Sequence, residues 1–343
     1  MEGRSLLTPR RERVLKHVVE EYVVTALPVG SEALARKYRP PVSSATIRNE
    51  FAALEESGLI GHPYTSAGRI PTDLGYRYYV EHLMQDGELS QTEVRTIAHQ
   101  FHQVENDVDE WVRLASSVLA NAVRSAAVVS FPVSPRTRLR RAELVPLGEN
   151  LVLLAVMLES GTLRKQMIHT DSPVDRAELT RLSNRLTSLV GGRDAARAAR
   201  EAERSSGLEQ QVLRAVERIL RHAEEQVLEQ VSYEGLSHML AQPEFASSQK
   251  ALPVVEALER GYLLARLLAQ AESGTEVRVV IGHEHPMEQM RETSAVLIRY
   301  GLSDDASGVL GVLGPTRLAY WRAVPMVRYL AGLMQLLMAE ARS

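Results

Sequence analysis

The chain has 343 residues, a formal net charge of −3, 45% hydrophobic residues and no cysteine. Its length fits about two domains, or three small ones. The absence of cysteine excludes disulfide frameworks, thiolate catalysis and cysteine-ligated zinc, and the slightly acidic balance argues against non-specific coating of nucleic acid while allowing a local basic surface. No apolar run approaches the ~18 residues of a membrane span, and no signal-peptide core is present. We therefore expect a cytoplasmic protein without a membrane partner.

Two helices are expected before residue 41. Thr8 and Pro9 mark a helix start, because Thr can cap the first turn and Pro needs no backbone N–H at the first helical position. Apolar residues with helical spacing continue to residue 23, and the Leu-Pro-Val-Gly segment at 27–30 ends this helix. Ser31 is expected to cap the second helix, which the prolines at 40 and 41 terminate.

The stretch 41–72 carries the most specific pattern. A helix is expected from its cap at Ser43 to Gly58, a residue suited to the left-handed conformation that ends helices. Ile47, Phe51 and Leu54 share one side, which predicts a core face. The outer side and its shoulders carry small or polar residues: Ser44, Ala45, Thr46, Arg48, Asn49 and Ala52.

This outer face suits DNA. Small side chains let the backbone approach a major groove, Asn49 can form two hydrogen bonds with adenine, and Arg48 can bind guanine or phosphate. A tight hairpin turn follows at 64–68 with Arg69 beside its tip, where an Arg can enter a minor groove or contact phosphate. The helix alone could be an ordinary amphipathic helix. Three helices followed by an Arg-bearing hairpin instead predict a winged helix-turn-helix DNA-binding domain at residues 1–85.

Basic residues also cluster at the start of the first helix. They form either a solvated face or a contact to the DNA backbone: Arg10, Arg11, Arg13 and Lys16.

Two segments of the head closely resemble the HrcA family of bacterial heat-inducible transcription repressors: VSSATIRNEFAALEESGLI at 42–60 and HPYTSAGRIPTDLGYRYYVEHL at 62–83. The resemblance implies a homodimer that binds double-stranded DNA at an inverted-repeat operator, the CIRCE element, upstream of chaperone operons. It also implies that the GroEL chaperonin modulates repressor activity. Carried over by position, it places DNA contacts within 43–50 and 65–69. The candidate DNA-binding residues are Ser43, Ser44, Ala45, Thr46, Arg48, Asn49, Ala52, Thr65, Ser66, Gly68 and Arg69.

The remaining chain predicts a multidomain α+β protein. Helices are expected at 76–84, 91–109, 111–124 and 175–190, and strands at 126–133, 142–147, 151–158 and 162–170. Strands resume at 277–281, 294–299 and 309–313, after a mainly helical, charged region. We therefore predict an inserted, mostly helical module at 191–271.

Two further segments resemble the HrcA family: YEGLSHMLAQPEF at 233–245 and GVLGVLGPTRLAYWRAVPMVRYL at 308–330. They depart from its usual pattern at His238-Met239, where Asn-Leu is typical, and at Leu318, where Met is usual. The resemblance implies a GAF-like α/β body at 86–190 and 272–343, and a dimerisation role for the insert.

Other motifs favour no catalytic, metal or cofactor site. Gly308, Gly311 and Gly314 lack the Gly-Lys-Ser/Thr of a phosphate loop, and tight packing explains them better. His283-Glu284-His285 would alternate across a strand, unlike an HExxH metal site. Two alternatives remain: a regulator whose GAF-like domain binds a small molecule, and an enzyme that uses the head as an adaptor. The lack of a coherent catalytic constellation argues against the enzyme.

Overall fold

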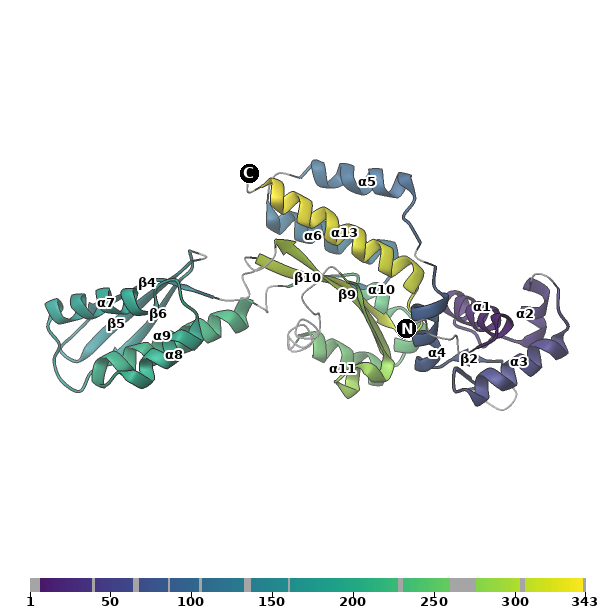
Figure 1. Ribbon diagram of the computed structural model, residues 1–343, viewed down its shortest axis with the longest axis horizontal. Helices are drawn as coiled ribbons and strands as arrows, with labels where there is room; N and C mark the ends of the chain where they lie inside the picture. The colour runs from purple at the N-terminus through teal and green to yellow at the C-terminus, as the bar shows by residue number, and fades with distance from the viewer. Residues whose placement is uncertain are drawn as a thin grey trace. The chain divides into compact units, whose positions relative to one another are not determined.

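The computed structural model forms two compact units (Figure 1). The first comprises Met1–Pro132, Val231–Leu302 and Gly308–Ser343, and the second Val133–Gln230 with Ser303–Ser307. The structure describes residues 7–38, 41–63, 68–85, 87–104, 107–132, 137–159, 161–227, 231–259, 276–302 and 306–341. Among the described residues, no helix is long and apolar enough to cross a membrane.

The N-terminal part of the first unit, which we call the head, is built from helical segments and a small two-stranded hairpin. Its elements are α1 (Pro9–Thr25), α2 (Ser31–Lys37), α3 (Ser44–Glu56), β1 (Ile60–Gly61), β2 (Ile70–Pro71), α4 (Asp73–Tyr78) and the π-helix η1 (Tyr79–Leu83). Thr8 caps α1 as predicted, and Ala26 ends it in the left-handed conformation. The expected cap Ser31 is wrong: Gly30 holds the cap position in an extended conformation, so Ser31 is already the first helical residue.

The rest of the first unit, which we call the body, is a five-stranded sheet covered by helices on both faces (Figure 1). The strand order is β7 (Val231–Glu234), β3 (Ala126–Ser130), β10 (Ala306–Pro315), β9 (Thr293–Leu302) and β8 (Arg278–Ile281). One face packs against α6 (Val108–Val123) and α13 (Tyr320–Glu340), with α5 (Gln91–His102) beyond them. The other face packs on α10 (Leu236–Leu240), the turn η2 (Pro243–Phe245) and α11 (Ser248–Glu259).

Close packing explains the three regularly spaced glycines of β10. A Cβ atom at Gly308 would lie 2.6 Å from the Tyr300 ring, and one at Gly311 would lie 2.4 Å from the Val296 carbonyl oxygen. At Gly314 it would lie 2.7 Å from the Ser125 hydroxyl. The packing interpretation of these glycines is therefore confirmed.

The second unit is a sheet of its own with three helices. The antiparallel strands β4 (Leu139–Pro146), β5 (Leu151–Leu158) and β6 (Leu163–His169) lie in that order, and α7 (Arg176–Val190), α8 (Ala195–Arg204) and α9 (Gly207–Val227) complete the unit. One face of the sheet buries Val152, Leu154 and Val156 against the helices. Strand β4 is covered along its edge, where the Ser183 hydroxyl of α7 accepts the Leu144 N–H at 2.9 Å.

The boundaries between the two compact units differ from the expected boundaries of the insert at 191–271. Residues 137–190, which we assigned to the body, form one hydrophobic core with α8 and α9, whereas 231–259 pack with the five-stranded sheet. Strand β7 lies inside the segment expected to be mainly helical. It is only four residues long and pairs with β3 through tertiary contact, with Tyr233 opposite Val128.

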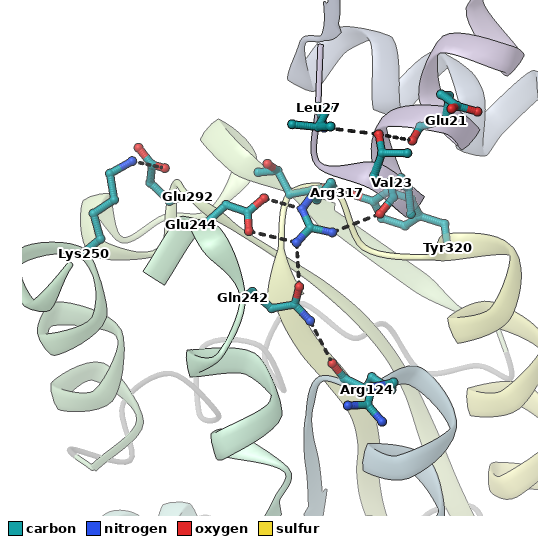
Figure 2. A network of polar contacts seen from close by, with 12 residues as sticks. Glu21, Val23, Leu27, Arg124, Gln242, Glu244, Lys250, Glu292, Arg317 and Tyr320 are labelled. Carbon is teal, nitrogen blue, oxygen red and sulfur yellow. Dashed lines mark hydrogen bonds and ion pairs between the residues drawn. The ribbon is translucent and has the colours of Figure 1, made fainter. Parts of the chain in front are cut away.

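Arg317 joins the head to the body (Figure 2). Its side chain is 10% exposed and donates both to the Glu244 carboxylate, with one contact at 3.2 Å, and to the Gln242 amide oxygen at 2.6 Å. It also donates to the Val23 carbonyl at 3.0 Å, in the last turn of α1. Carbonyls at a helix C-terminus lack intrahelical partners and carry partial negative charge. The Arg317 guanidinium therefore provides a hydrogen-bond donor for the C-terminal turn of α1 and, at the same time, a counter-charge for the Glu244 carboxylate.

A second attachment connects α4 with the loop after β8. The Asp73 carboxylate accepts the His283 N–H at 2.9 Å, and Arg77 donates to Glu284 at 2.8 Å and to the Val279 carbonyl at 2.8 Å. His285 is buried and its ring lies 3.4 Å from the Thr293 hydroxyl. Burial lowers the pKa of His285 to about 4, so its ring is neutral at pH 7. The side chains of the His-Glu-His segment thus have separate partners rather than a shared centre.

We predict that Arg317→Met lowers the free energy of unfolding of the first unit by about 3 kcal/mol, because it strands Glu244 in a mostly buried position. Urea unfolding followed by tryptophan fluorescence measures this loss. The matched control is Arg322→Met, which removes a cation that is 43% exposed and pairs with Glu93 at 2.8 Å; it should cost about 1 kcal/mol or less. Equal losses in the two variants would mean that the buried contacts of Arg317 contribute no more to stability than an exposed ion pair.

Candidate nucleic-acid interface

Helix α3 presents the predicted outer face to solvent. Ile47, Phe51 and Leu54 are 0%, 5% and 0% exposed, which confirms the predicted core face. Ala45, Arg48, Asn49 and Ala52 are exposed on the helix, while Ser44 and Thr46 are half-buried. The exposed face therefore carries the polar side chains of Arg48 and Asn49 between the small residues Ala45 and Ala52.

Ser43 fixes where α3 begins. Its hydroxyl accepts the Thr46 N–H at 3.1 Å and lies 2.8 Å from the Thr46 hydroxyl, so both side chains take part in the cap. The N-terminal turn of α3 is consequently held by its own residues. A helix start with exposed N–H groups also attracts anions such as phosphate.

Arg48 remains available at the surface although it reaches α2. Its Nε donates to the Ser31 hydroxyl at 3.3 Å, and its guanidinium lies 3.9 Å from the Glu32 carboxylate. The Arg48 side chain is 64% exposed, and ion pairs of this kind contribute little in water. A stronger anion can therefore replace Glu32 at low cost.

The hairpin is attached to two parts of the head through Arg69. The backbone N–H and carbonyl of Arg69 exchange hydrogen bonds with Val29, at 2.9 and 2.8 Å. Its guanidinium pairs with Glu55 of α3 at 2.8 Å, and Glu55 also lies against His62. The sequence predicts that Arg69 lies beside the hairpin tip, where it can contact DNA; in the structure its side chain is 24% exposed and its guanidinium is paired with α3.

Gly68 has a packing reason to be glycine. A Cβ atom there would lie 2.7 Å from the Val29 carbonyl group, closer than any side chain can approach. The return strand of the hairpin can therefore lie directly on the chain between α1 and α2. The other two hairpin candidates, Thr65 and Ser66, lie outside the described residues.

The basic cluster of α1 has partners within the head. Arg11 pairs with Glu50 of α3 at 3.1 Å, and Lys16 lies 3.8 Å from Glu20. The Arg13 guanidinium lies over the Tyr38 ring, 5.6 Å from its centre. The sequence did not indicate the roles of Arg11 and Arg13 because Glu50 and Tyr38 are distant along the chain, whereas Glu20 is only four residues from Lys16. It does show that Glu50 occupies the same expected helix as the candidate contacts.

These features make a surface suited to DNA. The outer face of α3 combines hydrogen-bonding groups that can read bases with small residues that permit close approach. The hairpin beside it is positioned by Arg69 and Gly68.

Comparison with known proteins matches nearly the whole chain to one family. A family model described as the HrcA protein C terminal domain matches residues 109–324. The chain is 42% identical over 341 residues to the Heat-inducible transcription repressor HrcA of Herpetosiphon aurantiacus, covering 97% of this chain and 96% of that protein. It is 41% identical over 342 residues to the protein of the same name from Roseiflexus castenholzii, covering 97% and 95%.

The fold also has a counterpart among solved structures. A crystal structure of a hypothetical protein at 2.2 Å resolution aligns with a TM-score of 0.63 and 22% sequence identity, over 97% of this chain and 99% of that one. At this identity the likeness concerns the fold alone. The alignments with the two sequence relatives extend over nearly the full length of those proteins. Both relatives are transcription repressors rather than enzymes. This chain therefore belongs to the HrcA family of heat-inducible transcription repressors.

Proposed function

We propose that this protein represses chaperone operons by binding promoter DNA through a winged helix-turn-helix head. The exposed face of α3, opposite the buried Ile47, Phe51 and Leu54, is the observation that carries this proposal. In such domains the reading helix enters the major groove, and its N-terminal part meets base edges. Membership in a family of transcription repressors supports the same reading. The protein would act in the cytoplasm, where the chromosome lies.

The proposed contacts follow from the chemistry of each side chain. Asn49 reads adenine, and Arg48 leaves Glu32 to bind guanine or phosphate. Ala45 and Ala52 let the α3 backbone approach the groove. The other α3 contacts are Ser43, Ser44 and Thr46, and the hairpin contributes Thr65, Ser66, Gly68 and Arg69.

We place the dimer contact on the second unit. Its helices cover one face of the β4-β5-β6 sheet, while the opposite face exposes apolar residues in register: Val145 beside Leu153, Leu153 beside Met167, and Met157 beside Leu163. Val145, Met157, Leu163 and Met167 are 42%, 38%, 49% and 62% exposed. Exposed apolar patches of this kind mark association surfaces. A second copy of the chain is the occupant that also matches the two-fold symmetry of an inverted repeat.

The body is proposed to be GAF-like and to serve as the scaffold that fixes the head. Its five-stranded sheet with helices on both faces supports this. The head attachments through Arg317 and Arg77 would transmit the spacing of two bodies to two reading helices.

GroEL is proposed as a partner that maintains active repressor, as the family resemblance implies. Refolding the chain with and without GroEL, and scoring the fraction that binds operator, tests this. An equal active fraction would contradict it.

Selection of bound DNA from a random pool tests the proposed function. An inverted repeat of the CIRCE type would support both the repressor function and the two-fold symmetry. Recovery of unrelated sequences, or of single half-sites only, would contradict them.

For Asn49→Ala, we predict a loss of about 1–3 kcal/mol in the preference for the operator over a variant operator at one adenine. Titrations with both DNAs measure the ratio of affinities. Glu56→Ala, an exposed substitution at the other end of α3, should leave that ratio unchanged. If the Asn49 variant keeps the wild-type ratio, Asn49 does not read a base.

For Arg69→Ala, we predict weaker operator binding and a decrease of about 1 in the slope of log affinity against log salt, as for one lost phosphate contact. The control Glu55→Gln removes the ion-pair partner but keeps the Arg69 charge, so its slope should stay at the wild-type value. An unchanged slope for Arg69→Ala would mean that Arg69 only anchors the hairpin.

For Met167→Lys, we predict a shift from dimer to monomer in sedimentation, because an ammonium group would be buried unpaired in the contact. Leu336→Lys is the matched control, since Leu336 is 56% exposed on α13 of the first unit. Deleting 191–271 would be less informative because it also removes β7 from the body sheet. A dimeric Met167 variant would rule out this face.

A further inference from the structure

Four arginines line one cavity in the second unit. The cavity has a volume of about 360 Å³ and lies where the chain passes from α7 into α8. Its described lining consists of Arg138, Gly192, Arg193, Asp194, Arg197 and Arg200. None of these six residues is aromatic or a large aliphatic residue, so the cavity is lined for charge rather than for an apolar ligand.

Backbone hydrogen bonds hold the mouth of the cavity together. Gly192 adopts a left-handed φ of +68° and donates its N–H to the Leu139 carbonyl at 2.7 Å. The Leu139 N–H in turn donates to the Arg193 carbonyl at 3.1 Å. These bonds fix Arg138, the residue before β4, next to Arg193.

Helix α8 supplies the other two arginines by its periodicity. Arg197 and Arg200 are three residues apart and therefore share one side of α8, whereas Arg193 lies two residues before the helix begins at Ala195. The opposite side of α8 is buried through Ala195, Ala198 and Ala202. Arg197 and Arg200 therefore lie on the side of α8 away from its buried alanines.

The positive charge of this cavity is only partly compensated. The Arg197 guanidinium pairs with Glu201 at 2.8 Å, whereas the Asp194 carboxylate accepts the backbone N–H of Arg197 at 3.0 Å and caps α8. Within the described residues, the guanidinium groups of Arg138, Arg193 and Arg200 have no hydrogen-bond or ion-pair partner. Arginine does not deprotonate near neutral pH, so a lining of four arginines and one carboxylate, that of Asp194, carries net positive charge and favours an anion.

We infer that this cavity binds a diphosphate group. Guanidinium groups match phosphate oxygens with paired hydrogen bonds, and three uncompensated cations suit an anion of more than one phosphate. The cavity at about 360 Å³ exceeds what one phosphate fills. The group is either free pyrophosphate or the diphosphate of a nucleotide; both present the same chemistry to the arginines. This site is separate from the proposed DNA contacts and does not depend on them.

Calorimetric titration of the full chain with pyrophosphate, ADP, adenosine and sulfate tests the site. Pyrophosphate should bind at least about tenfold more tightly than sulfate, because it offers more charge-assisted hydrogen bonds. ADP should bind and adenosine should not, if the diphosphate carries recognition. Pyrophosphate that binds no more tightly than sulfate, or adenosine that binds as well as ADP, would overturn the inference.

Two variants localise the binding. Arg193→Gln combined with Arg200→Gln should weaken pyrophosphate binding at least about tenfold. Arg181→Gln removes one exposed charge on α7, outside the residues that line the cavity. This control should change the affinity for pyrophosphate less than about twofold. The melting temperature without ligand reports that each variant is folded. Undiminished binding in the double variant would overturn the inference.

Duplex DNA gives a third, separate outcome. If the double variant loses operator affinity and the wild-type chain binds no pyrophosphate, the arginines contact DNA backbone and the inference is wrong. Operator binding that is unchanged in the double variant, with pyrophosphate binding lost, would support it.

Discussion

The buried guanidinium of Arg317 is the interaction on which the placement of the head depends. It ties the C-terminal turn of α1 to Glu244 and Gln242 of the body, so that a helix end and a carboxylate share one cation. Removing either partner would leave an uncompensated polar group in a mostly buried position. Since α3 packs on α1, the direction of the proposed reading face is set by this junction together with the Arg77 contact to Glu284.

The second unit has a sheet with one exposed apolar face. A three-stranded sheet has two faces, and among the described residues of this unit the helices pack against one of them. The uncovered face exposes Met157, Leu163 and Met167, which is costly for a monomer and useful for association. Its arginine-lined cavity lies at the helix end of the same unit. The proposal of self-association rests on exposed apolar side chains of this unit, and the proposal of diphosphate binding rests on its cluster of arginines.

Prediction from sequence worked where the signals are local. The cap at Ser43, the buried side at Ile47, Phe51 and Leu54, and strand β5 were all predicted from neighbouring residues. It failed where a residue's partner lies far along the chain. The expectation for Arg11 did not include its ion pair with Glu50, 39 positions away, and β7 was missed because its stability comes from β3. The start of the insert, expected at 191, likewise depends on which of the two sheets each segment of the chain packs against.

The sequence by itself determined the helices of the head, the candidate residues of α3 and, through its motifs, the family. Caps, apolar periodicity and glycine positions act over a few residues, so these features are readable without a fold. Only the tertiary structure decided that Arg69 pairs with Glu55, that 137–190 belong with α8 and α9, and that four arginines share one cavity. It also brought Arg317 to Val23, 294 positions earlier. Such contacts depend on the long-range packing of preformed elements, which no local pattern encodes.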